Sequence, residues 1–199
     1  MAVVSGGTTL IDNGALDAGV PTGNLILLST QTASASASIS FTSGIDSTYD
    51  SYVFKLINIH PATYDKILEF NMSTDGGSNY NVTKTTTSFR AYHGEGGGEA
   101  LQYRASDDLA QGTGFQFLNT GSGNNDDDCI NLELKIFSPS STTFVKHFIA
   151  RTIDSGSGAY AIDIYTAGYG NTTSAINAIR FQMTSGNIDS GIIKMYGVK

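Results

Sequence analysis

Apolar and polar residues alternate along much of this chain, and this pattern predicts β-strands. Near the end of the sequence, Ile179, Phe181 and Met183 alternate with polar residues, and Ile193 and Met195 do the same after a turn-forming Ser-Gly-Asn segment. Successive side chains of a strand point to opposite faces, so each stretch presents one apolar face. We therefore expect a strand, a turn and a second strand here, paired as a hairpin.

Comparable stretches recur through the chain and are separated by residues that favour turns. They cover residues 25–28, 33–42, 52–59, 67–73, 82–89, 115–117, 130–136, 144–151 and 160–165. Residues 33–42 alternate most regularly, which predicts one strand, and residues 52–59 are apolar on both parities, as in a central strand. Residues 74–79 predict a hairpin connection.

No segment longer than a turn or two has the helical period. About ten short strands at near-regular spacing are typical of a sandwich or jelly roll. The sequence therefore predicts an all-β fold, a jelly-roll-like antiparallel β-sandwich, with residues 24–199 forming one domain. Residues 1–23 differ, because Gly and Pro interrupt their apolar runs. We expect an extended N-terminal arm that lies on a neighbouring surface through Leu10, Ile11, Leu16 and Val20.

Charge and cysteine content narrow the functional classes. The 199 residues carry a net charge of -7, and their 11 basic residues are scattered. Binding to a nucleic-acid backbone needs clustered Lys and Arg, so we expect no nucleic-acid partner. The single cysteine, Cys129, excludes an intrachain disulfide. No secretory signal and no apolar run of about 18 residues is visible, so we expect a soluble protein without membrane insertion.

The sequence contains few residues in patterns typical of catalysis or metal binding. The sequence contains no nucleophile elbow, zinc-protease motif or phosphate loop, and its three histidines share no ligand spacing. The acidic run at residues 124–128 could supply oxygen ligands to calcium, but it lacks the spacing of a calcium loop, and a solvated loop is favoured. We expect no catalytic residue, no metal site and no cofactor, and hence no enzyme.

Tyrosines at loops and strand ends are candidates for surface recognition. An apolar ring with a polar tip suits a binding surface, and Tyr80, Tyr92 and Tyr103 lie in or beside loops rich in Gly and Asn. The loops at 75–80, 92–104 and 119–128 would form the recognition surface. The alternative is that these rings cover the rim of the core.

Three stretches carry a resemblance to a known group of proteins. They are TTLIDNGALDAGVPTGNLILLST at residues 8–30, STDGGSNYNVTKT at residues 73–85 and SGNIDSGIIKMYGV at residues 185–198. Together they resemble β-sandwich virion structural proteins of tailed bacteriophages, especially aquatic ones. Residues 90–128 carry no such resemblance, as expected for a surface that varies between relatives.

The resemblance implies a protein of the virion, assembled in the host cytoplasm. It implies a capsid decoration, cement or head-fibre subunit, expected to be a homotrimer, that contacts the major capsid protein or other virion proteins. The alternative is a lectin-like, receptor-binding module of a tail fibre that binds a host surface glycan. Such families have no catalytic motif, so the resemblance assigns no site residues.

Overall fold

The computed structural model describes residues 3–12, 15–16, 25–157 and 159–199 of the chain. The strands are β1 (Val3–Ser5), β2 (Thr8–Asp12), β3 (Ala15–Leu16), β4 (Leu25–Ser36), β5 (Ile39–Phe41), β6 (Ser51–Pro61), β7 (Leu68–Ser73), β8 (Lys84–Gly94), β9 (Glu99–Tyr103), β10 (Gln116–Phe117), β11 (Ile130–Phe137), β12 (Lys146–Asp154), β13 (Tyr160–Gly170), β14 (Ala178–Met183) and β15 (Ile188–Val198). None of the described residues forms a helix that could cross a membrane.

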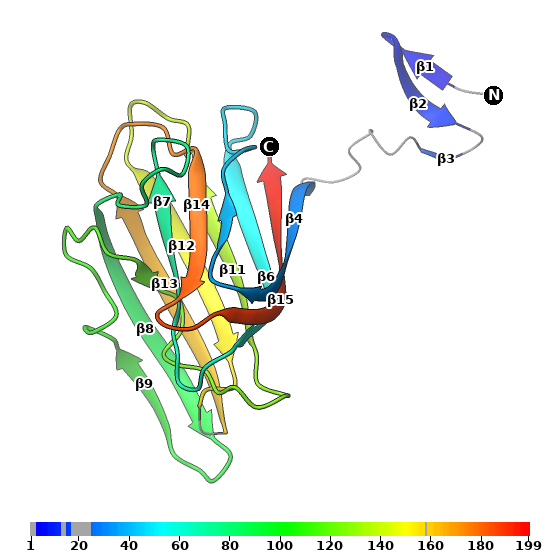
Figure 1. Ribbon diagram of the computed structural model, residues 1–199. Coiled ribbons are helices and arrows are strands. Elements are labelled where there is room, and N and C mark those ends of the chain that lie inside the picture. The colour runs from blue at the N-terminus through cyan, green and yellow to red at the C-terminus, as the bar shows by residue number, and fades with distance from the viewer. Residues whose placement is uncertain (1–2, 13–14, 17–24, 158) are drawn as a thin grey trace.

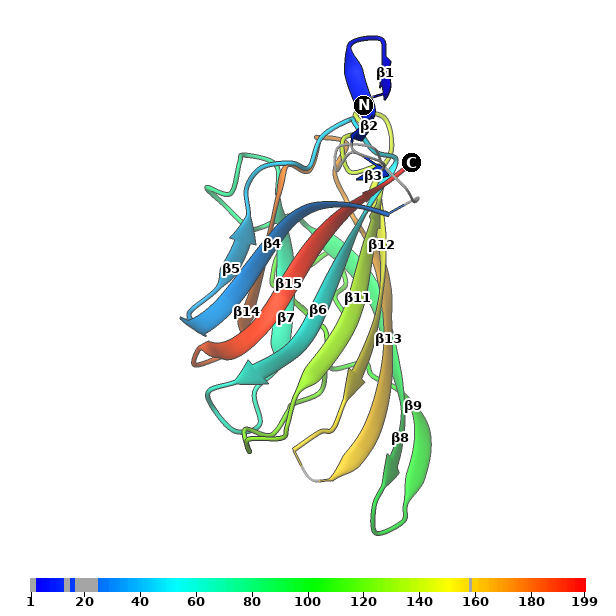
Figure 2. The ribbon, with the colours of Figure 1, turned by 90° about the vertical axis from the view of Figure 1, so that its right-hand side faces the viewer.

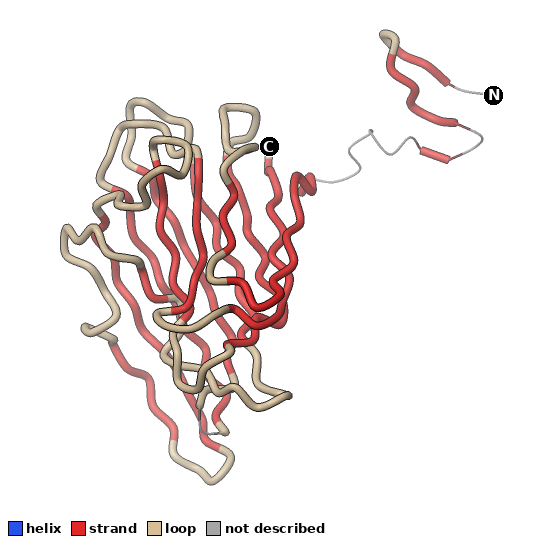
Figure 3. The backbone as a smooth tube through the Cα atoms, in the orientation of Figure 1, coloured by secondary structure: helices blue, strands red, loops and turns tan. Residues whose placement is uncertain are grey.

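Two antiparallel sheets pack face to face, which confirms the predicted β-sandwich (Figures 1 and 3). The larger sheet has the order β4-β15-β6-β11-β12-β13-β8-β9, and the smaller has the order β10-β7-β14-β5. Figure 2 looks onto the larger sheet, with β4, β15, β6 and β11 side by side.

The strand order is that of a jelly roll with an extension. In the larger sheet, β15 lies between β4 and β6, and in the smaller sheet β14 lies between β5 and β7. The end of the chain thus returns to pair with its beginning in both layers, as in a double Greek key. The strands β12, β13, β8 and β9 continue the larger sheet past β11, and only part of them, including Phe148 on β12, packs on the smaller sheet.

The core lies between the smaller sheet and the overlapping part of the larger one. Phe54 and Phe181 pack with ring centroids 5.7 Å apart, and Phe70 meets Phe148 edge-on at 5.0 Å. All four rings are buried. Each such side chain contributes about 1.5–3 kcal/mol of transfer free energy, and edge-on aromatic pairs add to it.

The alternation near the C-terminus is confirmed, but the predicted hairpin is wrong. Ile179, Phe181, Met183, Ile193 and Met195 are all buried, as expected. However, β14 pairs with β5 and β7, whereas β15 pairs with β4 and β6. Residues 74–79 likewise lead from β7 to β8 in the other sheet. A turn within a sheet and an arch between sheets use the same turn-forming residues, so composition cannot separate them.

The single strand expected over residues 33–42 is two strands. The chain leaves β4 after Ser36 and enters β5 of the other sheet at Ile39. Ala35 has a positive φ of 47° and is exposed, whereas Ala33, Ile39 and Phe41 are buried. Small side chains tolerate this crossing, which an alternating pattern does not reveal.

The described part of the N-terminal arm forms a small sheet of its own. Strands β1, β2 and β3 pair with one another, and no strand of the sandwich joins that sheet (Figure 1). Leu10, Ile11 and Leu16 lie on β2 and β3, but their side chains, like the whole of Val20, lie outside the described residues. Val3 and Val4 on β1 are exposed.

Away from the core, the inner face of β8, β12 and β13 carries many polar side chains beside the buried Ile162 and Ile164. Thr86, Ser88, Thr152, Asp154 and Thr166 are buried there. The segment 104–123 supplies hydrogen-bond partners to this face: the Thr86 hydroxyl donates to Gln116 Oε1 at 2.7 Å, and Asn119 Nδ2 donates to Asp154 Oδ2 at 2.8 Å. Segment 104–123, which includes the short edge strand β10 of the smaller sheet, thus covers this face with paired polar side chains.

The core predicts a large stability difference between two phenylalanines. Phe181→Ala should lower the free energy of unfolding by about 3–5 kcal/mol, because it leaves a cavity among packed rings. Phe144→Ala, which removes a side chain that is 69% exposed, should change it little. Denaturant titration of both variants checks this, and similar values for the two would contradict the assigned core.

Candidate functional site

The outer face of the larger sheet carries a strip of exposed apolar side chains, here called the outer strip. Its members come from the neighbouring strands β12, β13, β8 and β9. They are Phe89, Leu101, Tyr103, Ile149, Ile153 and Tyr165. Leu101 is 75% exposed, and both isoleucines are 51% exposed. Contiguous exposed apolar surface of this kind is typical of an interaction site.

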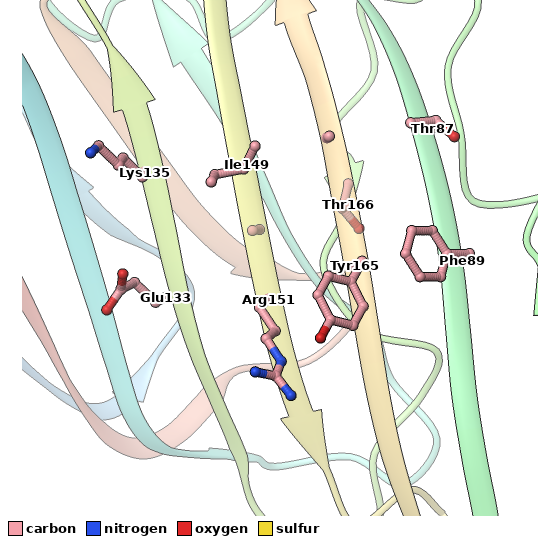
Figure 4. Close-up of a pocket in the computed structure, with 10 residues that line it drawn as sticks. Thr87, Phe89, Glu133, Lys135, Ile149, Arg151, Tyr165 and Thr166 are labelled. Atoms are coloured by element: carbon pink, nitrogen blue, oxygen red, sulfur yellow. The ribbon is translucent and has the colours of Figure 1, made fainter. Parts of the chain in front are cut away.

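The strand register brings the aromatic members into one row. Tyr165 lies opposite Phe89, and Phe89 lies opposite Tyr103. The rings of Phe89 and Tyr165 stack with centroids 5.0 Å apart and planes 6° apart. Figure 4 shows them side by side on their strands. Because cross-strand neighbours hold each other in place, the row is a preformed surface.

One fixed ion pair lies beside this row. Arg151 donates from Nε and Nη2 to the two carboxylate oxygens of Asp163 at 3.0 and 2.8 Å. These hydrogen bonds raise the pKa of Arg151 above its ordinary value. The guanidinium also lies 5.1 Å from the centroid of the Tyr165 ring. The charge is thus paired and held against an aromatic face, which lowers the cost of covering it with a partner.

A groove follows the strip between β8 and β11. It has a volume of about 380 Å³ and is lined by side chains that include Phe89, Lys135, Ile149, Arg151 and Tyr165 (Figure 4). More open hollows continue on the same face, one beside Ile153 and Ala161, the other beside His147 and Tyr169. The hollows are shallow and mainly apolar, so their shape suits protruding side chains of a partner surface.

The structure does not bring the three candidate tyrosines together. Tyr103 belongs to the outer strip, and its hydroxyl donates to the Asp108 carboxylate, which raises the pKa of Tyr103. Tyr92 lies on the inner face of β8, with Arg90 5.0 Å from its ring centroid and Tyr160 edge-on to it. The predicted recognition roles of these residues remain predictions.

Tyr80 lies near the opposite end of the sandwich. Its hydroxyl is buried and has no hydrogen-bond partner among the described residues, and the Arg180 guanidinium covers its ring at 4.1 Å. Loop 75–80 contacts Asn177, whereas loop 119–128 reaches Gly156 near the other end of the strands (Figure 1). The three loops therefore do not form one continuous surface.

The acidic loop 124–128 borders a separate polar pocket of about 430 Å³ that also includes His60 and Asp189. Within it, the Asp128 carboxylate accepts hydrogen bonds from the backbone N–H and the amide of Asn125, at 3.0 and 2.8 Å. Across the described residues, no group of three or more His, Cys, Asp or Glu is arranged to hold a metal ion. The Asp128 carboxylate oxygen that a calcium ion would need as a ligand thus already accepts hydrogen bonds from within the loop.

Most of the outer strip was missed by sequence reasoning, although a signal existed. On β12, Ile149 and Ile153 have the parity opposite to buried Phe148 and Ala150. Apolar residues on both parities indicate a strand whose two faces are both apolar, even when only one of them is buried in the monomer.

No protein-family model matches this chain, and no curated protein matches it either.

The loop that carries Tyr80 depends on the Asp75 carboxylate. Ser73 and Asn79 donate hydrogen bonds to it, which lower the pKa of Asp75 to about 2. Because this folded-state pKa is below the ordinary 3.8, its stabilising contribution is complete above that pH and is lost as pH falls towards 2.

The backbone N–H of Asn79 donates to Asp75 Oδ1 at 2.9 Å. We expect this N–H to lose protection from hydrogen exchange as pH falls over the acidic range, and to be unprotected already at neutral pH in the Asp75→Ala protein. Exchange measured by NMR checks both effects. Asp126→Ala, in the acidic loop, is the control and should leave Asn79 protected. An Asp75→Ala protein with normal protection at Asn79 would contradict the assigned role.

Proposed function

We propose that this protein is a structural subunit on the surface of a bacteriophage particle, a capsid decoration, cement or head-fibre subunit that acts by assembly. The observation that carries the proposal is the outer strip, a broad apolar surface on a rigid sheet that no described part of the chain covers. The resemblance of three stretches to virion proteins of tailed bacteriophages supports the same role. The site of action would be the virion.

The chemistry of the strip favours a protein partner. Its aromatic members are of the kind enriched at protein interfaces, and its central charges, Arg151 and Asp163, already form a pair. A partner can therefore cover the strip without leaving an isolated charge buried. The proposed partners are the major capsid protein, another virion protein, or further copies of this chain in a homotrimer. The net charge of -7 favours solubility before assembly.

The N-terminal sheet supports a second contact. Three strands of three, five and two residues form it, and Val3 and Val4 remain exposed. Such a small sheet is marginally stable in water unless it packs on another surface. We propose that the arm, with Leu10, Ile11, Leu16 and Val20, binds the capsid shell or a neighbouring subunit.

A tail-fibre module that binds host glycans is the second candidate. The stacked pair of Phe89 and Tyr165, beside Arg151 and Asp163, favours it, because aromatic faces and fixed charged groups together suit sugar recognition. Copy number separates the two: a decoration subunit is present in hundreds of copies per particle, a tail module in a handful. Binding to a glycan array that is lost in Tyr165→Ala or Tyr103→Ala, both on the outer face, would favour the tail module.

Charged substitutions in the outer strip should block assembly. Phe89→Asp and Ile149→Asp place a carboxylate where a partner would bury apolar surface, so we expect the amount incorporated into particles to fall at least about tenfold, equivalent to 1.4 kcal/mol or more. The measurement is quantitative mass spectrometry of purified particles. Phe144→Asp, an exposed substitution outside the strip, is the control. Normal incorporation of both strip variants would contradict the proposal.

Removal of the arm should separate folding from assembly. A protein lacking residues 1–22 should keep the β-sheet circular dichroism and the cooperative unfolding of the full chain, because β4–β15 pair without β1–β3. We expect it to be absent from particles when it is expressed in place of the full chain. Incorporation at the normal copy number would show that the arm is not an anchor.

A further inference from the structure

Lys84 and Asn71 form an unusual buried pair between the two sheets. Lys84 begins β8 of the larger sheet, Asn71 lies on β7 of the smaller sheet, and both side chains are fully buried. Lys84 Nζ donates to Asn71 Oδ1 at 2.6 Å and to the Val82 carbonyl at 2.8 Å. No carboxylate among the described residues pairs with this ammonium group. A buried amine thus lies against a buried amide.

The side-chain amide of Asn71 has hydrogen-bonding groups around both its oxygen and its nitrogen. The Met72 backbone N–H donates to Oδ1 at 2.8 Å. The carbonyl oxygens of Tyr80, Thr113 and Gly114 lie 2.7, 3.0 and 3.4 Å from Nδ2. An amide nitrogen carries two hydrogens, so three acceptors match the three hydrogens of a protonated leaving amine. The site provides a donor at the oxygen and acceptors at the nitrogen.

We propose that Lys84 and Asn71 condense into an amide bond that joins the two sheets covalently and releases ammonia. The Nζ lone pair attacks Cγ of Asn71, negative charge develops on Oδ1, and the Met72 N–H stabilises it. A proton passes from Nζ to Nδ2, the Cγ–Nδ2 bond breaks, and ammonia leaves. The atoms balance without an oxidant, a reductant or a further reactant.

Burial supplies the reactive state of the amine. Desolvation lowers the pKa of Lys84 to about 7, so a large share of the amine is neutral and nucleophilic near neutral pH. Burial also keeps water from competing for the carbonyl carbon. No acid–base side chain is seen to contact the pair in the described part of the chain, so we expect a slow reaction that follows folding.

A second buried lysine provides an internal comparison. Lys146 lies across Gly170 from Lys84 in the same row of the sheet. Its Nζ donates to the carbonyl oxygens of Phe144 and Thr172, at 2.6 and 3.3 Å, and to no side-chain amide within the described residues. Lys146 therefore shares the burial of Lys84 but lacks an electrophile, and it should remain a free amine.

The experiment is mass spectrometry of the purified full-length chain, fresh and after several days at about pH 8, above the lowered pKa of Lys84. We expect the intact mass to fall by one ammonia. Trypsin should then fail to cleave after Lys84 and yield a fragment of residues 67–90 that lacks one ammonia, because Lys66 and Arg90 remain cleavable. Cleavage after Lys146 should be normal. Asn71→Asp, which replaces the amide by a carboxylate, should keep its full mass and be cleaved after Lys84.

Three outcomes would overturn the proposal. The first is an unchanged mass after incubation, with cleavage after Lys84. The second is loss of ammonia with normal cleavage after Lys84, which indicates succinimide formation at an asparagine. The third is an equal loss in Asn71→Asp, which places the reaction elsewhere. If Asn71→Asp does not fold, the peptide map of the chain without substitutions is sufficient to decide whether the bond between Lys84 and Asn71 forms.

Discussion

The unequal width of the two sheets is the constraint on which the rest of the structure depends. The smaller sheet has four strands and the larger has eight, so one layer covers only part of the other. Where they overlap, aromatic and aliphatic side chains such as Phe54, Phe70 and Phe181 exclude water. Beyond the overlap, the inner face of the larger sheet needs another cover, and its outer face has none among the described residues.

Polar side chains cover the inner face of the larger sheet where the smaller sheet does not. Segment 104–123 lies against β8 and β12, and its side chains satisfy groups that would otherwise be buried without partners. Burying a carboxylate here has a free-energy cost. Desolvation raises the pKa of Asp154, although Asn119, Ser122 and the Gly156 N–H all donate hydrogen bonds to it. Such a network depends on every partner, so this half of the sandwich is more sensitive to single polar changes than the apolar half.

The outer face follows from the same mismatch and leads to the proposed function. Strands β12, β13, β8 and β9 project apolar side chains away from the core, and neighbouring strands align them into rows. A rigid sheet presents such a surface with little conformational entropy to lose on binding, which favours assembly. The outer strip and β1 of the N-terminal sheet both expose apolar side chains, such as Leu101 and Val4, that no described part of the chain covers.

The sequence by itself determined the all-β class, most strand positions and which parity faces inward. Side-chain alternation is local, so residues such as Ile179 and Ile193 could be assigned to the core without knowing their neighbours. Only the tertiary structure decided the sheet to which each strand belongs. Turn-forming residues serve hairpins and arches alike, so the placement of β14 and β15 in different sheets was not readable.

The same limit applies to the candidate sites. Tyr80, Tyr92 and Tyr103 were all predicted to lie in or beside loops, yet one lies under Arg180, one on the inner face of β8 and one in the outer strip. Their environments, like the contact of Lys84 with Asn71, are set by strand register and by the packing of one sheet on the other. Pairings between distant segments depend on how the whole chain packs, and local residue patterns do not encode them individually.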